Sequence, residues 1–112
     1  MFGLGKQGGY KEISSFELES LRASGSALIV DVREPAEYAA GHIEGAVNVP
    51  LSRFDPGRLP REEGRTVILQ CRSGGRSRMA LEKCNVARTA IDTHLAGGLE
   101  AWKRAGLPVV RG

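Results

Sequence analysis

The part of the chain with the clearest potential for chemistry is the run Cys71-Arg72-Ser73-Gly74-Gly75-Arg76-Ser77. It joins a segment typical of a buried strand to one with helical spacing, so we expect a tight turn, and Gly74 and Gly75 permit the positive φ values that such a turn needs. In such a turn, successive backbone N–H groups point inwards and form an anion-binding nest. The helix that follows adds the positive end of its dipole.

The cysteine at the start of this run is the candidate nucleophile. Thiolate is the reactive form of cysteine, and helix N-termini and nearby arginines lower the pKa of a thiol. Arg72, Arg76 and Arg78 supply such charge, so we expect Cys71 to have a lowered pKa. The alternative is an inert, buried Cys71 at a strand end, because free cysteine is among the most buried residue types. That alternative leaves the glycines and arginines unexplained.

Five short apolar segments predict the strands that position this run. Continuous runs rich in β-branched residues predict two buried strands, at 27–32 and 66–70. Shorter segments predict an edge strand at 11–13 and further strands at 46–49 and 91–96. The two buried strands end next to Asp31 and Cys71, which we expect to lie at the same edge of the sheet.

Four helices are predicted between and after these strands. Ser14 and Glu17 form a capping box that starts the first helix, which should stop at Gly25. Pro35 suits the first position of a second helix, which runs to Gly41. A third helix follows Ser77, and its end is left open between Asn85 and Arg88. The last covers 99–105, with Gly106 in a Schellman turn.

The alternation of strands and helices predicts a single α/β domain. Its architecture should be a three-layer one, with a mainly parallel sheet of about five strands and helices on both faces. Ligands of such sheets bind beyond the carboxyl ends of the strands, where Asp31 and Cys71 fall. We expect a flexible, Gly-rich leader at residues 1–9 and the folded domain at 10–112.

Composition narrows the class of function. The chain has 112 residues, a formal net charge of +3 and 5% aromatic residues, which is well short of a nucleic-acid-binding footprint. Two cysteines cannot build a disulfide framework, so the core must come from packing. No apolar run has the length of a membrane span, and the start lacks the pattern of a signal peptide. We therefore expect a cytoplasmic protein without membrane or nucleic-acid partners.

Three ordered stretches resemble the single-domain rhodanese family. The first is Asp31-Val32-Arg33-Glu34 with Tyr38 and then Gly41-His42-Ile43-Glu44-Gly45-Ala46-Val47-Asn48. The second is the run from Cys71 to Ser77. The third is Gly97-Gly98-Leu99-Glu100-Ala101-Trp102, followed by Gly106-Leu107-Pro108-Val109. The resemblance implies a rhodanese-like domain.

The resemblance also implies a sulfurtransferase. Cys71 would attack the outer sulfur of thiosulfate or a related sulfane donor, and cyanide or a thiol would then remove the sulfur from the resulting persulfide. The substrate-binding residues would be Arg72, Ser73, Gly74, Gly75, Arg76 and Ser77. Among these, Arg72 would bind the donor's oxyanion. No metal or organic cofactor is implied.

Two other functions are open as alternatives. The first is a sulfur-relay module that accepts persulfide from a partner protein, which an exposed apolar patch beside Cys71 would favour. The second is phosphatase or arsenate reductase chemistry. Rhodanese-like phosphatases of the cell-cycle type have a loop that is longer by one residue, whereas Arg76 comes five positions after Cys71. The shorter loop favours sulfur over a phosphoryl group.

Other polar residues have simpler interpretations. Asp31 and Arg33 are expected to form a structural ion pair near the site. His42 is expected to cap a helix, and His94 to pack or form hydrogen bonds locally. Cys84 has helical spacing from buried positions and is expected in the core, with a resolving thiol as its alternative. The histidines and cysteines include no close pair, so no zinc site is predicted.

Overall fold

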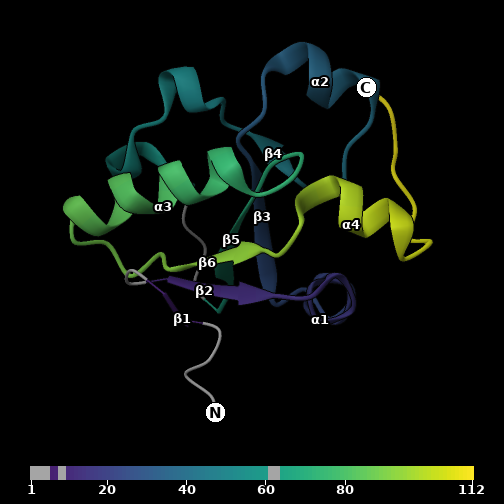
Figure 1. The fold of residues 1–112 in the computed structure, drawn as a ribbon, viewed down its shortest axis with the longest axis horizontal. Coiled ribbons are helices and arrows are strands. Elements are labelled where there is room, and N and C mark those ends of the chain that lie inside the picture. The colour runs from purple at the N-terminus through teal and green to yellow at the C-terminus, as the bar shows by residue number, and fades with distance from the viewer. Residues whose placement is uncertain (1–5, 8–9, 61–63) are drawn as a thin grey trace.

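A computed structural model describes residues 6–7, 10–60 and 64–112 of the chain (Figure 1). It contains a six-stranded sheet with strand order β1-β2-β6-β5-β3-β4. The strands are β1 (Lys6–Gln7), β2 (Tyr10–Ile13), β3 (Ala27–Asp31), β4 (Val47–Asn48), β5 (Thr66–Gln70) and β6 (Thr93–Leu95). Strand β1 pairs antiparallel with β2, and the other pairs are all parallel. The five parallel strands confirm the predicted α/β sheet.

The N-terminal part of the sheet differs from the prediction. Residues 10–13 form β2, which pairs with β1 on one side and β6 on the other, so the expected edge strand is an inner one. The leader predicted at 1–9 lies outside the described residues, except for Lys6 and Gln7 in β1. In the centre, β3 and β5 pair along their whole length, and β3 is buried at every position. This pairing aligns Asp31 with Gln70, the residue before Cys71.

Four α-helices and two short 3₁₀ helices connect the strands. They are α1 (Ser15–Ala23), α2 (Pro35–Ala40), η2 (Leu51–Arg53), η3 (Pro56–Arg58), α3 (Gly75–Val86) and α4 (Gly98–Arg104). The predicted capping box of Ser14 and Glu17 starts α1, and Pro35 begins α2. After α4, Leu107 N–H donates to the carbonyl of Trp102, which confirms the Schellman turn. No helix in the described part of the chain is both long and apolar enough to cross a membrane.

The end of α3 resolves the boundary that the sequence leaves open. Helix α3 ends at Val86, and Asn85 is helical rather than left-handed. Arg88 instead takes the left-handed conformation, with φ 58°. The N–H of Thr89 donates to the carbonyl of Cys84 at 3.1 Å, as in a Schellman turn. The turn therefore forms without the glycine that usually occupies this position.

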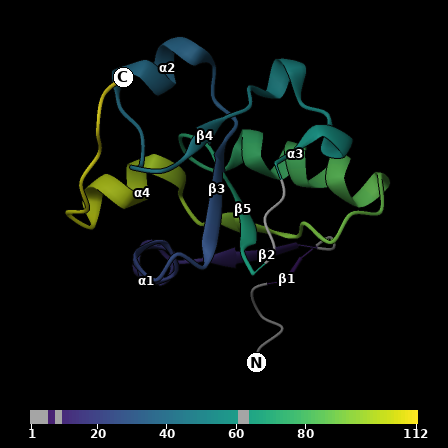
Figure 2. The same cartoon turned by 180° about the vertical axis from the view of Figure 1, so that it is seen from behind.

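The helices cover both faces of the sheet. Helices α1 and α4 lie on one face and α3 lies on the other, as the two opposite views show (Figures 1 and 2). The first layer packs around a core that includes Leu18, Ile29, Ile68, Leu99 and Trp102. The second packs around Val30, Leu69, Ala80, Leu81 and Cys84. This three-layer arrangement brings α2, α3 and the N-terminus of α4 to the carboxyl edge of the parallel strands.

Candidate active site

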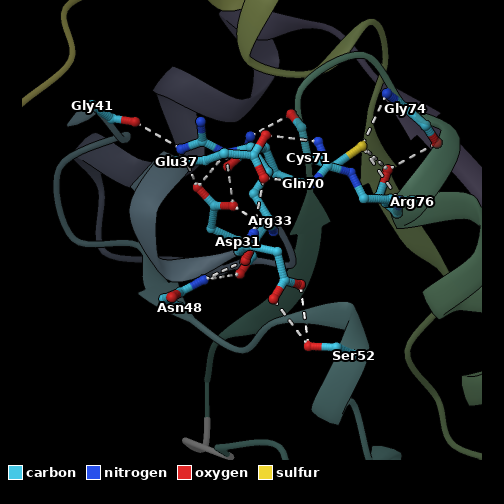
Figure 3. A network of polar contacts seen from close by, with 12 residues as sticks. Asp31, Arg33, Glu37, Gly41, Asn48, Ser52, Gln70, Cys71, Gly74 and Arg76 are labelled. Carbon is cyan, nitrogen blue, oxygen red and sulfur yellow. Dashed lines mark hydrogen bonds and ion pairs between the residues drawn. The ribbon is translucent and has the colours of Figure 1, made fainter. Parts of the chain in front are cut away.

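The Cys71 loop (residues 71–77) runs from the end of β5 into the first turn of α3 and encircles a sulfur atom. Cys71 Sγ accepts hydrogen bonds from the backbone N–H of Gly74 at 3.1 Å and of Ser77 at 3.4 Å (Figure 3). The hydroxyl of Ser77 lies 3.6 Å from the same sulfur. Cys71 is only 1% exposed, so a charge on its sulfur is stabilised by these groups rather than by bulk water.

These donors decide the ionisation of the thiol. Burial raises the pKa of Cys71, because it penalises the charged thiolate. Hydrogen bonds from the Ser77 hydroxyl and from the N–H groups of Ser77, Gly74 and Ser73 lower it, and they outweigh burial. The pKa of Cys71 therefore lies below its ordinary value. This agrees with the low-pKa thiol that the loop composition predicts.

The two glycines of the loop have different roles. Gly74 has φ +117° and precedes α3 as its N-cap, so it needs the freedom of glycine. Gly75 has no positive φ and starts the helix, so the turn uses the freedom that glycine permits at Gly74 and not at Gly75. Nothing lies within 4 Å of a Cβ added to Gly75. A single left-handed residue is enough to turn this loop into the helix.

The N-terminus of α4 forms backbone hydrogen bonds to the Cys71 loop. The N–H of Leu99 donates to the carbonyl of Cys71 at 2.8 Å, and the N–H of Glu100 donates to that of Arg72 at 3.0 Å. A Cβ on Gly98 would lie 2.5 Å from both of these carbonyl oxygens. In the sequence, Gly97 and Gly98 lie between the predicted strand at 91–96 and the predicted helix at 99–105. Their spacing before a helix gives no sign that they permit close approach to a loop distant in sequence.

Neither arginine of the loop is hydrogen-bonded to the sulfur in the described structure. Arg72 Nε lies 2.9 Å from a carboxylate oxygen of Glu100, with the Arg72 side chain 67% exposed. Arg76 forms two hydrogen bonds to Glu37, at 2.6 and 2.9 Å. The predicted oxyanion-binding residue Arg72 thus lies at the surface of the loop, and in this structure its guanidinium is paired with Glu100.

Glu37 contacts the Cys71 loop through Arg76 and is not among the site residues predicted from the sequence. It lies on α2, and its contact with Arg76 joins that helix to the loop (Figure 3). The hydrogen bond from Arg76 is the main reason that the pKa of Glu37 falls to about 2. Its position on a short helix far from Cys71 in sequence offered no local signal.

The pair of Asp31 and Arg33 lies beside the loop but does not enter it. Both residues are buried, and Arg33 donates to both carboxylate oxygens of Asp31. Arg33 Nη2 also donates to the carbonyl of Gly41, and the Asn48 amide donates to the carbonyls of both Asp31 and Arg33. The pair therefore ties the end of β3 to the segments after α2 and in β4 (Figure 3).

Of the two histidines, His94 is hydrogen-bonded to the Cys71 loop, whereas His42 caps α2. His42 Nδ1 lies 2.8 Å from the carbonyl of Tyr38 at the end of α2, which confirms the predicted helix cap. His94 is fully buried, with Nδ1 2.7 Å from Ser77 Oγ and Nε2 3.1 Å from Glu12 Oε2. The prediction of local packing for His94 is incomplete, because its ring contacts the Cys71 loop.

The second cysteine and the surface hollow lie outside this site. Cys84 is fully buried in the core on α3, and burial raises the pKa of its thiol. A hollow of about 400 Å³ is lined by Pro56, Met79, Glu82, Lys83, Val86 and Ala87, none of which belongs to the Cys71 loop. In the described part of the chain, no three acidic, histidine or cysteine side chains gather as metal ligands.

Comparison with known proteins identifies the family of this domain. The rhodanese-like domain family matches residues 14–105. A sulfurtransferase from Allochromatium vinosum is 36% identical over 100 residues, covering 88% of this chain and 94% of the relative. The uncharacterized protein slr1261 from Synechocystis sp. is 47% identical over 94 residues, which cover 84% of this chain and 52% of that protein. The chain thus spans about half the length of this relative.

A solved structure agrees with the architecture. The crystal structure of thiosulfate sulfurtransferase from Pseudomonas aeruginosa superimposes with a TM-score of 0.78 at 28% sequence identity, over 96% of this chain and 20% of that protein. The matching domain model covers the elements that carry Cys71, its loop and the supporting N-terminus of α4. The chain therefore belongs to the rhodanese-like domain family.

Proposed function

We propose that the chain transfers sulfane sulfur from thiosulfate or a related small donor to a thiol or cyanide, through a persulfide on Cys71. The observation that carries this proposal is the set of donors around Cys71 Sγ, with N–H groups at 3.1 and 3.4 Å and a hydroxyl at 3.6 Å. A lowered pKa favours the thiolate, which is the nucleophilic form of cysteine. The relatives named as sulfurtransferases support the same chemistry.

The first half-reaction makes the persulfide. The Cys71 thiolate attacks the outer sulfur of thiosulfate, and a new S–S bond forms to Cys71. The S–S bond of thiosulfate breaks, and sulfite leaves with its electron pair. The negative charge then resides on the terminal sulfur of the persulfide. Inward-pointing N–H groups of the Cys71 loop suit that charge, because hydrogen bonds to an ionised acceptor are stronger than neutral ones.

The second half-reaction restores the thiolate. The acceptor attacks the terminal sulfur, the Cys71–sulfur bond breaks, and its electron pair returns to Cys71. With cyanide as acceptor, the product is thiocyanate. The low pKa of Cys71 makes it a good leaving group in this step. Two half-reactions with a covalent intermediate predict ping-pong kinetics.

The test is a steady-state assay of thiocyanate formation from thiosulfate and cyanide. Wild-type protein should give parallel double-reciprocal lines, as ping-pong kinetics require. Cys71→Ser should reduce turnover to the uncatalysed rate, and Cys84→Ser, which removes the other buried thiol, should retain turnover. Retained turnover in folded Cys71→Ser protein, or its loss only in Cys84→Ser, would contradict the proposal.

A further inference from the structure

A line of polar contacts leads from the buried sulfur to the surface. Cys71 Sγ lies 3.6 Å from Ser77 Oγ, and Ser77 Oγ lies 2.7 Å from His94 Nδ1. On the far side of the ring, His94 Nε2 lies 3.1 Å from Glu12 Oε2. Ser77 and His94 are both fully buried, whereas the Glu12 side chain is 43% exposed. The contacts therefore connect the buried Cys71 thiol, which water does not reach, to the Glu12 carboxylate, which is exposed to water.

The hydrogens along this line can be assigned from the partners. The Glu12 carboxylate accepts, so Nε2 of His94 carries a proton and Nδ1 of the neutral ring is an acceptor. While Cys71 is a thiol, Ser77 Oγ can then donate to Nδ1 and accept from the S–H group. Once Cys71 is a thiolate, the hydroxyl donates to its sulfur instead. The carbonyl of Gly74 is a competing acceptor for the Ser77 hydroxyl, at 3.1 Å, but Nδ1 is the nearer one.

The surroundings of His94 favour the neutral form of the ring in the resting protein. Burial lowers the pKa of His94, Glu12 opposes this effect, and the positive charge of Arg78 on α3 adds to it. The ring of Tyr10 on β2 meets His94 edge-on, with 5.3 Å between the ring centroids. Glu12, also on β2, is the acidic residue in contact with the ring, and it would stabilise a proton gained at Nδ1.

We propose that His94 is a positioning residue that receives the Cys71 thiol proton through Ser77, with Glu12 holding the imidazolium that results. The S–H bond breaks and leaves its electron pair on sulfur, while the proton moves to Ser77 Oγ. The original Ser77 hydroxyl proton moves to His94 Nδ1. A thiol and an imidazole thus become a thiolate and an imidazolium, and the imidazolium stays between Ser77 and Glu12 as the counter-charge of the thiolate. The inference rests on the proposed function, since it supplies the nucleophile of the first half-reaction.

The test measures Cys71 ionisation without any sulfur donor. The rate of alkylation by iodoacetamide, assigned to the Cys71 peptide by mass spectrometry, is followed from about pH 5 to pH 9, which spans histidine and thiol titration. His94→Gln replaces the imidazole next to Ser77 with an amide that cannot take up a proton. This variant should raise the pH midpoint of Cys71 alkylation by about one unit. The rate near pH 6.5 should then fall roughly tenfold. Ser77→Ala should also raise the midpoint.

The double variant separates a relay from a general structural role. Because His94 acts through Ser77, adding His94→Gln to Ser77→Ala should cause no further shift, whereas independent effects would add. Ser77→Thr, which keeps the hydroxyl, should restore the wild-type midpoint. An unchanged midpoint in His94→Gln, or equal shifts in both backgrounds, would overturn the proposal.

Two matched controls and one milder variant complete the design. His42→Gln removes the other histidine and Glu82→Gln removes another carboxylate, and both should leave the midpoint unchanged. Glu12→Gln should raise the midpoint of Cys71 alkylation as His94→Gln does, but by less, and it is the deciding variant if His94→Gln does not fold.

The outcomes for the two proposals can be told apart. If these variants leave the midpoint unchanged while thiosulfate still forms the persulfide, only the role of His94 is contradicted. If the midpoint shifts as expected but no sulfur is transferred, only the proposed function is contradicted.

Discussion

The N–H of Leu99 donates to the carbonyl of Cys71 at 2.8 Å, so the last helix of the domain holds the first residue of the Cys71 loop. With its carbonyl fixed on α4, the loop turns its own N–H groups towards the sulfur. This contact depends on Gly98, where a Cβ would lie 2.5 Å from the Cys71 carbonyl oxygen. The glycine pair is thus part of the support of the site.

Gly98→Ala should displace the loop and abolish sulfur transfer. The added Cβ meets backbone atoms that cannot rotate away, and overpacking of this kind costs about 1–3 kcal/mol. Gly25→Ala is the matched control, because Gly25 also has a positive φ but nothing lies within 4 Å of its Cβ. Both variants should lower Tm, and only Gly98→Ala should lose thiocyanate formation. Equal activity in the two would contradict the role given to Gly98.

The two loop glycines should respond differently to alanine. Gly74→Ala forces an L side chain to φ +117°, which costs roughly 1–3 kcal/mol and moves the N–H that donates to Cys71. Gly75→Ala should be neutral or stabilising by about 0.4–1 kcal/mol, since its backbone suits alanine. Urea unfolding and the Cys71 alkylation rate measure both effects. If Gly75→Ala lowered the stability and the alkylation rate as much as Gly74→Ala, this interpretation of the turn would be wrong.

Arg72→Ala should weaken the use of thiosulfate more than that of an uncharged sulfur donor. A lost hydrogen bond to a charged group costs about 1.5–3 kcal/mol, which predicts a rise in KM of tenfold or more for the anion. Glu100→Gln is the informative partner variant, because it removes the carboxylate that competes for Arg72 at 2.9 Å. Its KM for thiosulfate should stay level or fall. Equal losses for both donors in Arg72→Ala would exclude Arg72 as the oxyanion-binding residue.

The contact between Glu37 and Arg76 should appear in the acid stability of the protein. Arg76 lowers the pKa of Glu37 from 4.5 to about 2, so the folded state holds the ionised form more strongly than the unfolded chain does. The resulting stabilisation is fully present above about pH 4.5 and is lost as the pH falls towards about 2. Both side chains are about one-third exposed, so we expect only about 1 kcal/mol.

Glu37→Gln should therefore lower the free energy of unfolding at neutral pH and flatten its pH dependence below about pH 4.5. Urea unfolding at several pH values measures this, and Glu82→Gln controls for the loss of one carboxylate. Parallel acid profiles for wild type and Glu37→Gln would show that the contact with Arg76 does not stabilise the fold.

Local signals predicted the fold well and the contacts of the site less well. The central strands, the capping box at Ser14 and the turn at Gly106 are encoded within a few residues, and the structure has each of them. The strand predicted at 66–70 is buried only over its last three residues, because Thr66 is exposed and Val67 half-buried. The Cys71 loop was also recognisable, because its composition is local. The contacts of Glu37 and His94 were not, since each reaches the loop from another element, and pairings between distant segments leave no periodic pattern.

A persulfide on Cys71 is tested most directly by the intact mass of the purified protein after incubation with thiosulfate, before and after cyanide, with Cys71→Ser alongside. The expected result is a gain equal to one sulfur atom, lost to cyanide with release of thiocyanate, and absent from the variant. A gain only from a protein persulfide donor would indicate the relay function instead. No gain from any donor, or the same gain in Cys71→Ser, would contradict a persulfide on Cys71.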